Sequence, residues 1–123
     1  MAYKHKSIIV DLTFLNKTIG NNREGRIMLI KAFLEQSNIK IKMLNEKIHE
    51  ADFDEIKKIT HFLKSSFSFM GLKCAASLSE IENLCEQKID IKKMKHLGHN
   101  VTKNYEKSRL EYIKILSKLL NHS

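Results

Sequence analysis

A histidine stands among small and basic residues in the segment HFLKSSFSFMG, which begins at His61. If this segment is helical, each residue advances the chain by about 100° around the helix axis. His61 then lies off the apolar face, with Ser65 and Ser68 as its neighbours one and two turns further on. Lys57 and Lys64 lie one turn before it and one turn after it. The imidazole is a nucleophile that can attack phosphorus, the lysines supply positive charge for an anion, and the serines leave space for another surface.

These residues alone leave two interpretations of His61 open. An exposed histidine on a helix is usually only a solvated residue, and flanking lysines are ordinary in a basic chain. The chemical interpretation requires a fold whose helices display the imidazole on a solvent-exposed face.

The first part of the chain predicts a short helix and a long one. Asp11 precedes the apolar segment LTFLNKTI and Gly20 follows it, which is the pattern of a capped helix with a glycine stop. Asn22 then caps a helix over residues 23–50, with a polar gap at Ser37 as its weak point. The predicted apolar face of this helix consists of Ile27, Ile30, Leu34, Ile41, Leu44 and Ile48.

Three further helices follow from similar signals. Asp52, with Glu55 three residues later, resembles a capping box, and Gly71 ends the helix that follows or marks a tight junction. An apolar stripe from Leu72 to Ile89 predicts the next helix, and Asp90 caps a last one. The predicted apolar face of the helix that carries His61 consists of Phe53, Ile56, Thr60, Leu63, Phe67 and Met70.

The composition favours a single all-α domain over residues 1–123. The chain contains four glycines and no proline, whereas an all-β domain needs turn residues every ~8–12 positions. Short connections between the predicted helices favour antiparallel neighbours. We therefore predict an antiparallel up-down four-helix bundle with an additional short N-terminal helix.

The chain carries 22 Lys and Arg against 14 Asp and Glu, a net charge of +8. Such a surplus is typical of proteins that bind nucleic acid, a membrane surface or an acidic partner, and it does not choose among them. The longest apolar run, residues 27–30, is far shorter than the about 20 residues of a membrane span. The N-terminus begins like a signal peptide, but Asp11 interrupts its apolar stretch, so we expect a cytoplasmic protein.

Neither a disulfide nor a metal site is predicted. Cys74 and Cys85, if they share one helix, lie roughly 16 Å apart along its axis, beyond the reach of a disulfide. His96 and His99 have a spacing that two metal ligands could use, but no cysteine or Glu-x-x-His pattern accompanies them.

The segment HFLKSSFSFMG resembles the motif of histidine-containing phosphotransfer domains. That motif is His-x-Leu-Lys-Gly-Ser, with a further glycine ten residues after the histidine. The similarity extends to DLTFLNKTIGNNREGRIMLIKAFLEQ and ASLSEIENLCEQ, the latter including the family's Leu–Glu-like pair Ile81-Glu82, and covers roughly residues 8–118. The positions that match in identity and spacing are His61, Leu63, Lys64, Ser66 and Gly71.

The resemblance implies a phosphorelay protein without an ATP site of its own. His61 would accept a phosphoryl group from an aspartyl phosphate of a receiver domain and pass it to another receiver. Lys64 would offset phosphate charge, with Lys57 as a weaker candidate. The partners would be receiver domains of response regulators or of a hybrid histidine kinase, and the magnesium ion would belong to the receiver. We expect a monomer with no small-molecule substrate.

One position departs from the family's pattern, because Ser65 stands where glycine is usual. Glycine there permits a partner to approach the histidine closely. Serine is the next smallest polar residue, so docking is expected to survive with altered affinity, although the change is also compatible with a specialised transfer site. Ser65 and Ser68 would together provide clearance and hydrogen bonds for the receiver.

Two questions stay open at the level of sequence. Phe62 and Phe69 lie off the core face, either as part of a wide apolar arc between neighbouring helices or as an exposed patch that docks a receiver. The alternatives to a relay are a basic helical nucleic-acid-binding module, recognisable by salt-dependent retention on DNA or RNA, and an adaptor without chemistry.

Overall fold

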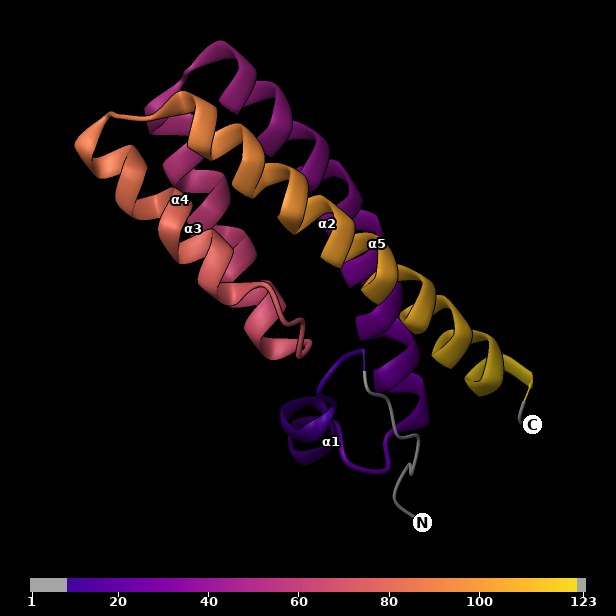
Figure 1. Ribbon diagram of the computed structural model, residues 1–123. Coiled ribbons are helices and arrows are strands. Elements are labelled where there is room, and N and C mark those ends of the chain that lie inside the picture. The colour runs from indigo at the N-terminus through magenta and orange to yellow at the C-terminus, as the bar shows by residue number, and fades with distance from the viewer. Residues whose placement is uncertain (1–8, 122–123) are drawn as a thin grey trace.

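The computed structural model describes residues 9–121, and α-helices account for most of this range (Figure 1). Within these residues there is no β-strand, so the predicted all-α class is confirmed. Both ends of the predicted domain, residues 1–8 and 122–123, lie outside the described residues, as does most of the segment that begins like a signal peptide. The helices are α1 (Thr13–Ile19), α2 (Arg23–Glu50), α3 (Phe53–Phe69), α4 (Ala75–Gln87) and α5 (Ile91–Asn121).

The predicted caps are confirmed at three of the long helices. The cap predicted for α1 is wrong, because its N-cap is Leu12 without a side-chain cap bond, and Asp11 accepts a hydrogen bond from the Thr13 N–H from one position earlier. The Asn22 side chain accepts a hydrogen bond from the Gly25 N–H at 2.8 Å. Asp52 accepts one from the Glu55 N–H at 3.3 Å, and Asp90 accepts one from the Lys93 N–H at 3.1 Å. These bonds satisfy backbone donors that have no partner inside the helix, which fixes where α2, α3 and α5 start.

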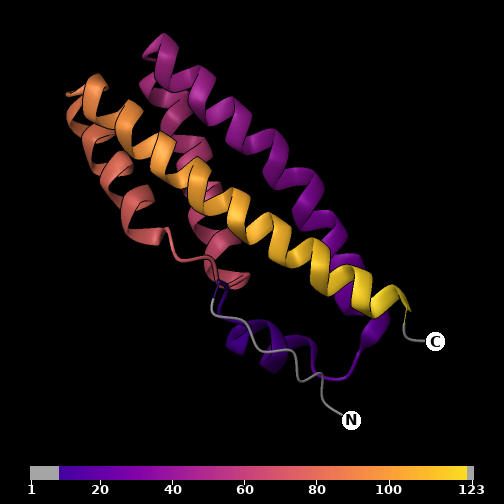
Figure 2. The same cartoon turned by 45° about the vertical axis from the view of Figure 1, so that its right-hand side comes forward.

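The four long helices contact one another in a closed ring. α2 packs against α3 and α5, and α4 packs against α3 and α5. Successive helices run in alternating directions, and α1 lies across the end of the ring where α3 finishes (Figures 1 and 2). The surface where α3 meets α4 is therefore on the opposite side of the ring from the surface where α2 meets α5.

The core face predicted for α3 is confirmed at five of its six positions, which are buried, whereas Phe53 at the start of the helix is only half-buried. Phe67 stacks on Tyr105 with ring centroids 5.9 Å apart, and Phe33 packs edge-on against Phe67 and Tyr112. The Tyr112 hydroxyl donates a hydrogen bond to the Met70 carbonyl and ties α5 to the end of α3.

The face predicted for α2 is wrong in part, because Ile27 and Leu34 are only half-buried. Their places are taken by Arg26, Phe33 and Ser37, which are buried. The two polar members have partners: the Ser37 hydroxyl is hydrogen-bonded to the Tyr105 hydroxyl at 3.0 Å. Arg26 donates to the Asn16 side chain at 2.8 Å and to the Gly20 carbonyl at 2.7 Å.

The stripe predicted from Leu72 to Ile89 is also too long. The helix α4 starts at Ala75, which is exposed, and Ile89 lies beyond its end with 48% of its surface exposed. Between them Leu78, Ile81 and Cys85 are buried as predicted. The helix stops at Lys88, which adopts a left-handed conformation with φ of 54°.

Gly71 forms the tight junction that its position predicts. Its φ is +73°, and its carbonyl accepts a hydrogen bond from the Asp11 N–H at 2.8 Å. A Cβ atom at this position would lie 1.7 Å from the Asp11 carbonyl oxygen. Only glycine allows the segment before α1 to approach the end of α3 this closely.

Among residues 9–121, no helix combines the length and the apolar character that a membrane crossing requires. Cys74 and Cys85 are both buried and both free.

Candidate functional site

His61 lies on the outer surface of α3, where 84% of its side chain is exposed. This placement confirms the expectation that the imidazole points away from the core. Its position follows from the register of α3, since Thr60 and Leu63 on either side of it in sequence are fully buried.

A carboxylate from the neighbouring helix lies beneath the imidazole. The Oε2 atom of Glu82, on α4, is 4.0 Å from Nδ1 of His61. The Glu82 side chain is 21% exposed, and its Oε2 atom is buried without a hydrogen-bond partner. Its other oxygen, Oε1, accepts a hydrogen bond from the Lys64 ammonium at 3.5 Å. Lys64 thus holds one oxygen of the carboxylate while the other faces the ring.

This geometry distinguishes the two nitrogens of the ring. A separation of 4.0 Å between Nδ1 and Oε2 is longer than a hydrogen bond, but a modest rotation of the exposed ring would close it. An Nδ1–H that donates to the carboxylate leaves Nε2 with its lone pair directed toward solvent. The arrangement can therefore present Nε2 as a nucleophile and balance positive charge on the ring.

Lys57 also pairs with a carboxylate of α4 rather than standing alone. Its ammonium lies 3.6 Å from Oε1 of Glu86, and both side chains are more than half exposed. Solvent screens such a pair, so an incoming phosphate can compete for the lysine at little cost. Lys57 and Lys58 line an open hollow of about 350 Å³ together with His61 and Glu82.

A second open hollow, of about 420 Å³, lies toward α1. It is lined by Phe14 of α1 and by Ser65, Ser68 and Phe69, three of the residues for which the sequence predicts contact with a partner. The rings of Phe14 and Phe69 meet edge to face with centroids 5.1 Å apart. Phe14 is 54% exposed, so it adds apolar surface next to the small serines.

Phe62 is not part of this hollow. Its ring is 38% exposed, and the ammonium of Lys40, on α2, lies 5.2 Å from the ring centroid. The predicted docking residues therefore divide into two groups on either side of α3, with Phe62 toward α2 and Phe69 toward α1.

The three remaining motif residues have structural roles. Leu63 is fully buried. Ser66 is half-buried, and its carbonyl accepts a hydrogen bond from the Met70 N–H at 3.0 Å. Gly71 supplies the positive φ at the junction with the segment before α1.

Sequence reasoning missed two residues of the site, Glu82 and Phe14. Both come from helices other than the one that carries His61, so the angular position of residues on α3 cannot reveal them. Glu82 did carry a signal, because it belongs to the segment similar to the family's helix after the glycine.

Away from His61, the described residues provide neither a metal cluster nor a reactive thiol. Among residues 9–121, no group of three or more His, Cys, Asp or Glu side chains is placed to hold a metal ion. Burial raises the pKa of the Cys74 thiol to about 12. Burial and the nearby Glu82 carboxylate raise the pKa of the Cys85 thiol to about 11. Both thiols therefore stay protonated at neutral pH and are poor nucleophiles.

No family model matches this chain, and comparison with curated proteins and with solved structures found no match either. The similarity to phosphotransfer domains thus rests on the motif around His61 and on the two further segments quoted with it. The function has to be argued from the geometry around His61.

Proposed function

We propose that this protein is a phosphorelay intermediate of two-component signal transduction, in which His61 carries the phosphoryl group. The observation that supports it is a highly exposed imidazole whose Nδ1 faces a buried, unpaired carboxylate oxygen 4.0 Å away. A merely solvated histidine has no need of such a group. The motif around His61 supports the same function independently.

The proposed step begins with a neutral imidazole that carries its proton on Nδ1. The Nε2 lone pair attacks the phosphorus atom of a receiver's aspartyl phosphate. The bond from phosphorus to the aspartate oxygen breaks and leaves its electron pair on the carboxylate, while a P–N bond forms at Nε2. The ring keeps its Nδ1 proton and gains positive charge, which the Glu82 carboxylate stabilises.

The reverse step returns the phosphoryl group to an aspartate of a second receiver. Nothing in the proposed chemistry requires a nucleotide, and the magnesium ion would be held by the receiver. Lys64 would move from Glu82 toward the phosphoryl oxygens as charge develops on them, because the 3.5 Å contact between its ammonium and Oε1 is weak.

The receiver would dock over α3 on the side of Ser65 and Ser68. Both serines are exposed, and Phe14 and Phe69 beside them offer apolar surface. Lys57 would meet the acidic rim of the receiver's active site. Phe62 would contact the receiver only if the docked domain also reaches toward α2.

The same proposal covers the finer features of fold and location. We propose that the closed ring of α2 to α5 is an antiparallel up-down four-helix bundle with α1 as an additional helix. The protein would act as a monomer in the cytoplasm, where receiver domains are found.

The test is phosphate uptake from a phosphorylated receiver domain of a hybrid kinase. The expected result is a label on this protein that is lost in acid and stable in base, as for a P–N bond. His61→Gln should abolish it, and His49→Gln, which removes an exposed histidine from α2, should not. No uptake from any receiver would leave the adaptor interpretation. Salt-dependent retention on nucleic acid without uptake would favour the nucleic-acid-binding alternative.

A further inference from the structure

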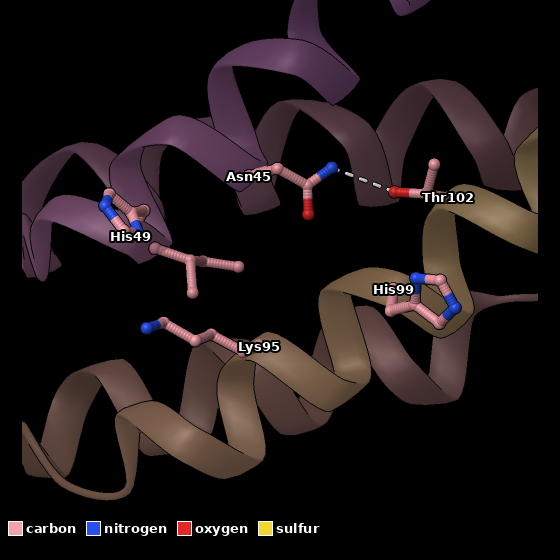
Figure 3. Close-up of a pocket in the computed structure, with 6 residues that line it drawn as sticks. Asn45, His49, Lys95, His99 and Thr102 are labelled. Atoms are coloured by element: carbon pink, nitrogen blue, oxygen red, sulfur yellow. Dashed lines mark hydrogen bonds between the residues drawn. The ribbon is translucent and has the colours of Figure 1, made fainter.

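A second polar groove lies between α2 and α5, on the side of the helix ring opposite His61. It has a volume of about 310 Å³, at the lower end of the range for small-molecule sites. Figure 3 shows the side chains that surround it. They are Asn45, Ile48 and His49 of α2 and Lys95, His99 and Thr102 of α5.

The floor of the groove is fixed by hydrogen bonds. The Asn45 amide donates to the Thr102 hydroxyl at 2.9 Å, drawn as a dashed line in Figure 3. The same amide nitrogen donates to the Ile41 carbonyl at 3.1 Å, and Thr102 donates to the Gly98 carbonyl at 2.8 Å. Asn45 and Thr102 thus hold each other in place, and the groups left to bind a ligand are those at the rim.

Close packing under the groove depends on Gly98. A Cβ atom there would lie 3.0 Å from both the Asn45 side-chain oxygen and the Ile48 side chain. Glycine at this buried position of α5 lets the two helices approach each other, although it weakens the helix itself. The floor and the rim are therefore held in a defined geometry.

Every side chain at the rim of the groove can donate a hydrogen bond or carry a positive charge. His49, Lys95 and His99 are exposed, and none of them forms an ion pair or hydrogen bond within residues 9–121. No Asp or Glu lines the groove. By contrast, Lys57 and Lys64 near His61 are each paired with a carboxylate of α4.

The charge of α5 around the groove favours an anion. Residues 91–105 contain four lysines and two histidines but no Asp or Glu, and the first turn of α5 has no acidic residue. Asp90 caps the first turn, but no carboxylate follows it before Glu106. Like charges spaced along one helix face repel one another, and a bound anion would offset that repulsion.

We propose that the groove binds a diphosphate group, either free pyrophosphate or the diphosphate of a nucleotide. Lys95 and His99 are four residues apart on α5, or about 6 Å along the helix axis, and His49 faces the groove from α2 (Figure 3). Two linked phosphates can contact donors at both ends of such a groove, whereas a single phosphate reaches only one end. Ile48 offers apolar surface for the remainder of a nucleotide.

The test is a titration of the whole protein with pyrophosphate, inorganic phosphate and ADP at constant ionic strength, followed by NMR. The resonances to follow are the side-chain amide of Asn45 and the imidazoles of His49 and His99, with His61 as the internal reference. We expect pyrophosphate and ADP to shift these resonances with affinity about tenfold tighter than inorganic phosphate. Equal affinity for pyrophosphate and ADP would identify the diphosphate as the ligand, and tighter ADP binding would identify the nucleotide.

Matched variants locate the binding. Lys95→Gln should weaken pyrophosphate binding about tenfold, whereas Lys114→Gln, at an exposed lysine further along α5, should leave it unchanged. Equal loss in both variants, or shifts confined to His61, would overturn the proposal. The proposal would also be overturned, in favour of a nucleic-acid surface, if a DNA duplex shifted the same resonances and bound more tightly than pyrophosphate. His61→Gln should bind pyrophosphate normally, so this result does not depend on the phosphorelay.

Discussion

Replacing Glu82 by glutamine removes a charge beneath the ring of His61 and leaves the size of the side chain almost unchanged. The amide oxygen of glutamine can still accept a hydrogen bond from Nδ1. The variant therefore isolates the electrostatic part of the proposed role. Because Oε2 is buried without a hydrogen bond, the loss of its charge should leave the fold as stable as before or slightly more stable.

The size of the effect follows from the distance between the ring and the carboxylate. Opposite unit charges 4.0 Å apart attract by about 1 kcal/mol in bulk water and about 4 kcal/mol at an effective dielectric constant of about 20. The imidazole is 84% exposed, and Lys64 already offsets part of the carboxylate charge, so the value lies toward the lower limit. We expect a loss of about 1–2 kcal/mol in the transition state, or a transfer rate roughly 5–30-fold lower.

The assay is the rate of phosphoryl transfer from a labelled receiver, with thermal unfolding measured in parallel. Glu86→Gln is the matched control, since it removes the same charge one turn further along α4 from a carboxylate paired with Lys57. A second measurement is the nitrogen chemical shifts of the His61 ring, which report the tautomer. Glu82→Leu should reduce the preference for the Nδ1–H form, and Glu86→Gln should not.

The reasoning would be refuted if Glu82→Gln and Glu86→Gln transferred at the same rate and the tautomer did not respond to Glu82→Leu. A lower melting temperature together with slower transfer would point instead to a packing role for Glu82. Slower transfer at an unchanged melting temperature is the outcome that only the charge can explain.

Four other predictions concern α3 and the glycines that follow α1 and α3. His61→Gln should abolish uptake while changing the free energy of unfolding by less than ~0.5 kcal/mol; label that persists would move the acceptor to another histidine. Lys64→Ala should slow transfer without abolishing it, because the nucleophile remains; an unchanged rate at low salt would remove Lys64 from the site. Ser65→Gln should weaken receiver binding, measured by calorimetry, together with transfer, whereas Ser65→Gly should preserve both; tolerance of glutamine would show that the receiver docks elsewhere. Gly20, after α1, has a φ of +61° and open space around its Cα, so Gly20→Ala should cost ~1–3 kcal/mol from backbone strain alone. Gly71→Ala should cost ~1–3 kcal/mol more than Gly20→Ala, because its Cβ would also collide with the Asp11 carbonyl; equal losses of the two variants in chemical denaturation would contradict the close approach.

The starts of α2, α3 and α5 could be predicted because capping is a local interaction, whereas α1 and α4 start without a side-chain cap and their starts were missed. Asn22, Asp52 and Asp90 each bond a backbone N–H three residues later, and that spacing is visible in the sequence. The register of α2 could not be predicted in the same way. Arg26 and Ser37 are buried only because partners on other elements satisfy their polar atoms.

At the site, too, local features could be predicted and contacts between helices could not. The exposure of His61 follows from the apolar positions of α3 alone. The carboxylate that faces its ring comes from α4, and the aromatic ring beside the serines comes from α1. Which residues of two helices meet depends on the packing of the whole ring, so these contacts become visible only in three dimensions.

The surplus of positive charge is distributed unevenly along the chain. The segment from α3 to the end of α4, residues 53–87, carries four lysines against five carboxylates, whereas α5 carries eight basic residues against two acidic ones. The surplus that could suggest nucleic acid or an acidic partner thus lies mostly on α5, away from His61. In the proposed relay, recognition of a receiver at His61 would then depend on local contacts with Lys64 and with the hollow lined by Ser65 and Ser68. Long-range attraction of anions belongs to the opposite side, where Lys95 and two histidines border a groove without a carboxylate.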